Sequence, residues 1–483
     1  MDTLMSKWDA LCASVDGVAT PTILAEKTQE LSKMVGVTDT EIRLFLCLIA
    51  AYPIAFLWRA LPSATIKHIY SVVLGWWMLQ FVIGYQFLHI MIPCVLCYLA
   101  MAVVGPKARY LTMLIAFGYL TGGHIYRMYT DYLGWTLDWT MQMMVVVQKL
   151  SALGYNYYDG NSKHAKPDQK LRGIEKLPSP LEFFSFILFP ANLVIGPSFE
   201  YTDYMAFANG TLNSPNPVLP ALWRLVQGLA LFVMNNAVMM YFPTWTLLNS
   251  KDFLTSGNIF TRYAQIWISL LGYRFKYYFG WKIAEGAGVM SGLGFNGINK
   301  ETGKAKWNRL ENIDVIGYET SQSLRDSASC WNKTTNLWLK YYFYERTPAP
   351  FNLYVTYFAS AFWHGFYIGY YLFFLSVAFA TQVHRNFRRI VRPLFMTPDG
   401  KHNGPYKIFY DAFCMVLTNL TTNYFIISFV VLAWENTYNA FKSLYFAGHI
   451  MLMLTYLIFG LGLIGGGGSS SKPAKKAGDA KTE

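Results

Sequence analysis

A stretch without Asp, Glu, Lys or Arg separates Arg346 from Arg385, and no other feature constrains the fold as strongly. The run is also rich in Phe, Tyr, Leu and Ala, and a bilayer interior favours such apolar residues and excludes charged side chains. The composition agrees, because 54% of the residues are hydrophobic and 14% are charged, compared with about 25% charged residues in an ordinary soluble domain. These features exclude a soluble globular protein and predict several membrane spans.

Apolar segments recur along the whole chain. They cover residues 44–58, 69–88, 90–104, 109–122, 183–196, 225–243, 259–273, 351–383, 407–433 and 440–464. Several are shorter than the roughly 20 residues that a full span needs, so we expect some helices to be tilted, broken or re-entrant. The predicted fold is therefore all-α: a polytopic membrane protein with about 9–11 transmembrane or re-entrant helices around an internal chamber.

The basic residues lie mainly between these apolar segments. The net charge is +12, and clusters of Lys and Arg occupy residues 163–176, 300–309 and 385–392. Loops of this kind orient membrane helices with their positive ends in the cytosol and contact anionic lipid. We therefore expect the lipid bilayer, and not nucleic acid, to be the partner of this charge, although any one cluster could also bind an anion.

Three regions follow from the distribution of polarity. Residues 1–42 are mixed in polarity and partly amphipathic, residues 43–464 form the membrane domain, and residues 465–483 form a flexible basic tail rich in Gly, Ser and Lys. The tail lacks the apolar residues needed for a packed core.

His364 lies near the middle of the charge-free stretch. A continuous helix from Arg346 would carry it about 27 Å, well into the bilayer. Ionisable residues at such depth usually face a cavity or a polar partner. A second polar residue, Asn332, lies as far before Pro348 as His364 lies after it. If two helices fold back at the prolines, Asn332 and His364 reach a similar depth and can share one chamber.

A neutral imidazole in a dry chamber can act as a general base, taking the proton of an alcohol as its oxygen attacks an acyl carbon. An amide such as that of Asn332 can orient the imidazole or donate to the developing oxyanion. Ser360 precedes His364 by one helical turn, but this stretch holds no acidic residue, so a serine triad is weakly supported. Simple hydrogen bonding between helices remains the alternative for both residues. No metal site is expected, because the histidines lack ligand spacing.

Five segments resemble motifs of the membrane-bound O-acyltransferase family, and within it of the lysophospholipid acyltransferase branch. They are SAFWHG at 360–365, the pair Trp331 and Asn332, GPSFEY at 196–201 with Tyr204, WKIAEG at 281–286 followed by GLGFNG at 292–297, and TNLTTNY at 418–424. Ile368 departs from the family pattern, which has proline at this position.

The resemblance implies transfer of a fatty acyl group from acyl-CoA to the free hydroxyl of a lysophospholipid in the endoplasmic reticulum membrane. It implies a catalytic His364 and a catalytic or orienting Asn332, with acyl-CoA as co-substrate and no bound cofactor. Residues expected along the acyl or lipid path are Trp281, Glu285, Trp331, Trp363 and Ser360. Packing is the alternative role for the tryptophans.

Two other functions stay open at this point. One is acylation of a protein or of another lipid by a member of the same family, although the residues 328–331 before Asn332 count against sterol and diacylglycerol acceptors. A transporter or lipid channel could instead use His364 as a proton relay or gate.

Overall fold

The computed structural model describes residues 22–397 and 404–461. Within these ranges the chain is mainly helical, and an isolated β-bridge joins Ile298 to Ala305. The predicted flexible tail, residues 465–483, lies outside the described part. The all-α fold of a multi-pass membrane protein is therefore confirmed.

The helices of the first half surround a large apolar core. They are α2 (Thr22–Val35), α3 (Asp39–Ala60), α4 (Ala64–Ile83), α5 (Phe87–Val104), α6 (Arg109–Thr130), α7 (Trp139–Asn161), α8 (Pro167–Lys170), α9 (Pro180–Ile187), α10 (Tyr201–Ala208) and α11 (Val218–Tyr241). Gly84 and Gly105, with φ of 58° and 72°, end α4 and α5. Both lie in a backbone region that glycine adopts without strain, so the chain can change direction there.

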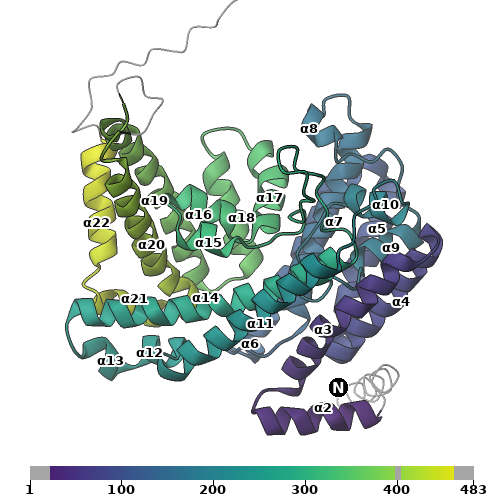
Figure 1. Ribbon diagram of the computed structural model, residues 1–483, viewed down its shortest axis with the longest axis horizontal. Helices are drawn as coiled ribbons and strands as arrows, with labels where there is room; N and C mark the ends of the chain where they lie inside the picture. Colours follow the sequence, from purple (N-terminus) through teal and green to yellow (C-terminus); the bar gives the residue numbers. More distant parts are fainter. Residues whose placement is uncertain (1–21, 398–403, 462–483) are drawn as a thin grey trace, which may run out of the picture.

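The second half adds a long helix and a second bundle. Its helices are α12 (Thr244–Asn249), α13 (Lys251–Thr255), α14 (Ile259–Met290), α15 (Val315–Glu319), α16 (Leu324–Cys330), α17 (Lys333–Tyr342), α18 (Asn352–His364), α19 (Ile368–Val391), α20 (Lys407–Val431), α21 (Trp434–Ser443) and α22 (Ala447–Thr455). Figure 1 shows α3, α4, α5, α9 and α10 on one side and α19, α20 and α22 on the other. Between them lie α15 to α18, above α14.

Four helical stretches of the described chain are long and apolar enough to cross a membrane: Asp39–Ala60, Ala64–Thr130, Val218–Asn249 and Lys407–Val431. A fifth would be formed by Trp434–Ser443 and Ala447–Gly460 together, which are bent by 79° at a short break. Such bends agree with the prediction of broken helices. An enclosed chamber stays a prediction.

Two local expectations can be compared directly with the structure. The continuous helix from Arg346 to His364 is wrong, because Pro348 and Pro350 precede a helix that begins only at Asn352. His364 therefore lies about 18 Å along α18. Ile368, at the position of the expected proline, is the first residue of α19. Proline is well tolerated at the first helical position, and isoleucine starts the helix at the same place.

Candidate active site

Hydrogen bonds to helix α7 fix the position of α17 along the axis of α7. Three side-chain hydrogen bonds connect the two helices: Gln148 to Thr335 (3.0 Å), Trp338 to Ser151 (3.0 Å) and Tyr342 to Asn156 (2.8 Å). The residue numbers rise together on both helices, so α17 runs in the same direction as α7. Moving back one turn from Thr335 brings the start of α17, at Asn332, to the level of residues 144 and 145 on α7.

Helix α18 reaches the same level from the opposite direction. The indole Nε1 of Trp363 donates to the backbone oxygen of Met144 at 2.8 Å. His364 follows directly and is the last residue of α18. The rings of Trp338 and Trp363 lie 6.1 Å apart, so α17 and α18 also contact one another. Asn332 and His364 thus lie at matching heights along α7, as the fold-back at the prolines predicts.

Aromatic rings of α19 and α20 surround the imidazole of His364. Its ring centroid lies 5.6 Å from Tyr370, 5.3 Å from Phe374 and 5.1 Å from Phe429. His364 is half-buried, and within the described chain its side chain makes no hydrogen bond. Both ring nitrogens therefore remain available to a substrate.

A second histidine, His124 of α6, lies beside His364. Its Nε2 is 3.1 Å from the backbone oxygen of Trp363. Because a carbonyl oxygen can only accept, Nε2 carries the proton and donates. The last carbonyls of a helix lack partners within the helix. His124 satisfies one of them directly before His364 and so fixes the end of α18.

Asn332 adopts a left-handed backbone, with φ of 43° and ψ of 51°. It precedes α17 at the capping position, yet its side chain does not bond to the helix. In the part of the chain that the structure describes, this amide has no hydrogen-bond partner and does not bond to His364. A half-buried, unpaired amide on a constrained backbone is free to bind a ligand.

Trp331, next to Asn332, lies in an aromatic cluster. The centroid of its ring is 5.0 Å from that of Tyr318, 5.1 Å from that of Trp281 and 5.7 Å from that of Tyr278. Trp331 and Trp281, two predicted path residues, are therefore in direct contact with each other.

Glu285 of α14 holds the segment before Asn332 in place. Its carboxylate is 1% exposed and accepts backbone N–H bonds from Asn312 (2.7 Å) and Ile313 (3.0 Å). It also accepts from the ammonium of Lys282 at 2.8 Å, and Arg224 lies 3.5 Å away. Both carboxylate oxygens are thus occupied by groups of the protein.

Asn312 connects the segment held by Glu285 to the start of α17. Its side-chain oxygen accepts from the backbone N–H of Thr334 at 3.1 Å and from the Thr334 hydroxyl at 2.8 Å. Its backbone oxygen accepts from the N–H of Lys333 at 2.8 Å. The two residues that follow Asn332 are therefore held by a chain of contacts that begins at Glu285.

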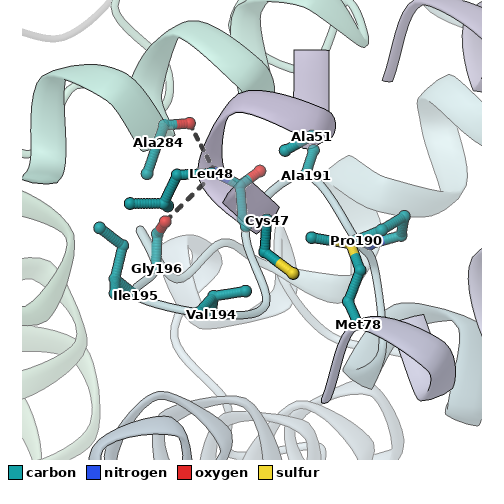
Figure 2. A pocket seen from close by; sticks show the side chains of 11 residues that line it. Cys47, Leu48, Ala51, Met78, Pro190, Ala191, Val194, Ile195, Gly196 and Ala284 are labelled. Carbon is teal, nitrogen blue, oxygen red and sulfur yellow. Dashed lines mark hydrogen bonds between the residues drawn. The ribbon is translucent and has the colours of Figure 1, made fainter. Parts of the chain in front are cut away.

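The GPSFEY segment holds the other end of α17. The carboxylate of Glu200 accepts from the Tyr342 hydroxyl at 2.9 Å and from the Asn156 amide at 2.8 Å. Just before it, Asn192 donates to the backbone oxygens of Ala284 at 3.2 Å and Gly196 at 3.5 Å, the two bonds drawn in Figure 2. The space around these two bonds, where α3 and α14 meet the segment before GPSFEY, has no room for a water molecule, so the three parts pack closely.

The TNLTTNY segment supports the aromatic cluster from α20. The side-chain oxygen of Asn423 accepts from Arg274, and the same guanidinium forms a bidentate pair with Glu319 at 2.9 Å for both bonds. The hydroxyl of Tyr278 donates to Glu319 at 2.8 Å. Because Tyr278 packs on Trp331, the contacts of this motif also support the segment that carries Asn332.

The remaining predicted residues lie on α18. Ser360 is buried one turn before His364, and Trp363 is anchored to α7 by its indole N–H. Sequence reasoning did not single out His124 or Asn312, although both contact the segments described above. Neither lies in a recognisable motif, and no local pattern in the sequence connects residues 239 positions apart such as His124 and Trp363.

Comparison with known proteins identifies the family of this chain. The model of the membrane-bound O-acyltransferase family matches residues 124–427, so the match begins at His124 and includes His364 and Asn332. A lysophospholipid acyltransferase of Schizosaccharomyces pombe is 32% identical over 89% of this chain and 88% of its own length. The lysophospholipid acyltransferase 2 of Arabidopsis thaliana is 30% identical over 89% and 96%.

A more distant relative comes from the mouse. The membrane-bound glycerophospholipid O-acyltransferase 1 of Mus musculus is 29% identical over 88% of this chain and 91% of its own length. The family model covers more than half of the chain, and the relatives extend the similarity over nearly all of it. This multi-pass membrane protein belongs to the membrane-bound O-acyltransferase family.

Proposed function

We propose that this protein transfers a fatty acyl group from acyl-CoA to the free hydroxyl of a lysophospholipid in the endoplasmic reticulum membrane. The names of the similar proteins support the acceptor. The observation that carries the proposal is the placement of His364 and Asn332 at one level of α7, each with polar atoms that no side chain in residues 22–397 and 404–461 occupies.

In the proposed reaction His364 acts as general base. One imidazole nitrogen takes the proton of the lysophospholipid hydroxyl while the oxygen attacks the carbonyl carbon of the thioester. A carbon–oxygen bond forms and the carbon–sulfur bond breaks. The CoA thiolate leaves and receives the proton, so the products are a phospholipid and CoA. No serine nucleophile is needed. Ser360, one turn before His364, then lines the acyl or lipid path on α18.

Asn332 stabilises the charge that develops on the carbonyl oxygen. Its amide is free and its backbone is fixed by the contacts of Lys333 and Thr334 with Asn312. Donors held in place before the reaction contribute most to such stabilisation, because they need no reorganisation. The alternative role, orienting the acceptor hydroxyl, uses the same amide.

The other predicted residues fall into two groups. Trp281 and Trp331 form the aromatic wall next to Asn332, where an acyl chain or lipid can pass. Glu285 and Trp363 act through other residues: Glu285 holds the Asn312 segment, and Trp363 sets the height of α18. Both are therefore positioning residues in this proposal.

The test is product formation by the purified protein. Oleoyl-CoA is supplied with a panel of lysophospholipids that differ in headgroup, and both CoA release and the acylated lipid are measured. We expect one or more lysophospholipids to be acylated, with one CoA released per ester formed. Acylation of a peptide or of another lipid, without any lysophospholipid product, would contradict the acceptor. Failure to consume acyl-CoA at all would favour the transporter.

A further inference from the structure

The imidazole of His124 contacts both chain neighbours of His364. Its Nε2–H donates to the backbone oxygen of Trp363 at 3.1 Å. A methyl group added at Gly365 would lie 3.4 Å from Cγ and 3.5 Å from Nδ1 of the same ring, so His124 also packs closely against Gly365. Because His124 is only 8% exposed, water does not compete for these contacts.

The backbone around His364 needs such a partner. The chain leaves the helical conformation at Gly365, with φ of 124° and ψ of −162°. Its N–H still bonds to the oxygens of Ala361 and Phe362, at 3.2 Å each. The oxygen of Trp363 comes later in the chain than these two and lacks a donor within the helix. His124 supplies that donor, so one side chain fixes how the chain leaves α18.

The candidate base depends on this backbone for its position. Catalytic histidines are commonly oriented by a hydrogen bond to the second ring nitrogen. In the part of the chain that the structure describes, the imidazole of His364 makes no such bond, and aromatic rings surround it. Rings limit its tilt, but the residues before and after it set where its nitrogens lie. A misplacement of about 1 Å at a reacting group can cost about a hundredfold in rate.

His124 itself lies on a firmly held part of α6. Its neighbour Gly123 lets α6 approach α7 closely, because an added Cβ there would lie 2.6 Å from the ring of Trp139. About one turn further along α6, the guanidinium of Arg127 lies 3.6 Å from the carboxylate of Asp138. Asp138 also caps the start of α7. The end of α6 and the start of α7 are therefore joined, and α7 is the helix that holds α18.

We propose that His124 is a positioning residue for the general base. By holding Trp363 and Gly365, it sets the place of the His364 imidazole relative to the acyl carbon and the attacking hydroxyl. This inference rests on the proposed role of His364 in acyl transfer. Because His124 acts through the backbone and not on a substrate, its loss lowers kcat and leaves substrate binding unchanged.

The test separates the hydrogen bond from the packing of the ring. His124→Phe keeps a flat ring against Gly365 but removes the N–H donor. In His124→Gln the amide nitrogen reaches the place of Nε2, so the bond to Trp363 can form again. We expect kcat for lysophospholipid acylation to fall about ten- to hundredfold in His124→Phe and to stay within about threefold of wild type in His124→Gln. The KM values for oleoyl-CoA and for the lysophospholipid should not change in either variant.

His89→Phe is the matched control. His89 lies on the neighbouring helix α5, where its ring stacks on Trp139 at 4.7 Å and its Nδ1 lies 2.9 Å from the hydroxyl of Tyr119. The substitution therefore also keeps a ring and removes one hydrogen bond of an imidazole, but it does not affect the end of α18. We expect wild-type kcat in this variant, and unfolding temperatures in detergent show whether each variant folds.

Three results would overturn the positioning role: wild-type kcat in folded His124→Phe, a raised KM at unchanged kcat, or an equal loss of kcat in His124→Phe and His124→Gln. If His124→Phe does not fold, His124→Asn replaces it, since the asparagine amide is polar but one bond too short to reach Trp363. Equal kcat in the Asn and Gln variants would then overturn the role. Wild type that acylates no lysophospholipid would overturn the proposed function itself, a result that needs no variant.

Discussion

The carboxylate of Glu285 accepts the backbone N–H of Asn312 at 2.7 Å, and this bond joins the long helix α14 to the segment that carries Asn332. Asn312 in turn bonds to Lys333 and Thr334, the first two residues of α17. The candidate catalytic amide is thus held by the protein interior through one buried carboxylate. Its own side chain stays free.

Replacing Glu285 by Gln tests this positioning. The substitution keeps the shape but removes the charge that balances Lys282, whose side chain is 5% exposed. Breaking a buried ion pair costs about 3–5 kcal/mol. We expect a lower unfolding temperature in detergent and a fall in kcat, with both KM values within twofold of wild type. Glu301→Gln, the same change on an exposed residue, is the control. A raised KM for either substrate at unchanged kcat would instead place Glu285 on the substrate path.

The roles of the backbone conformation and of the side-chain amide of Asn332 can be tested separately. Glycine adopts the left-handed backbone at no steric cost, whereas alanine there costs about 1–2 kcal/mol. Asn332→Gly should therefore unfold at a higher temperature than Asn332→Ala. If the amide stabilises the oxyanion, both variants lose kcat by about 10²–10³. Activity near the wild-type level in Asn332→Gly alone would show that only the backbone conformation matters.

Ile368 and Gly369 should respond in opposite ways to substitution. Ile368 begins α19, and the preceding Tyr367, with φ of −64° and ψ of 132°, has the backbone that precedes proline. Ile368→Pro should keep both activity and unfolding temperature within error or raise the latter slightly. A folded but inactive Ile368→Pro would show that this departure from the family pattern is functional.

Gly369 packs directly against α20, and an added Cβ would meet the backbone oxygen of Ser428 at 2.0 Å. Since backbone atoms cannot move aside without shifting the helix, Gly369→Ala should lower the unfolding temperature by several degrees and reduce expression. Gly122→Ala, inside helix α6, is a useful comparison, because no atom lies within 4 Å of the added methyl group there. Normal stability of Gly369→Ala would contradict the close approach of α19 and α20.

The sequence predicts the fold class because a charge-free stretch such as that before Arg385 has few solutions other than membrane helices. It also predicts the fold-back at Pro348 and Pro350, since proline ends helices through its missing N–H. The contacts of His124, Asn312 and Asn192 could not be predicted. They join residues far apart in the chain, and hydrophobic periodicity carries no information on which polar groups meet.

The role of His364 as general base is the central claim. We propose to measure kcat for lysophospholipid acylation by His364→Ala, with His164→Ala, an exposed histidine, as control and with unfolding temperatures to confirm that both variants fold. The account predicts a fall of about 10²–10⁴ in His364→Ala at nearly unchanged KM values, and wild-type turnover in the control. Turnover by folded His364→Ala within tenfold of wild type would contradict it.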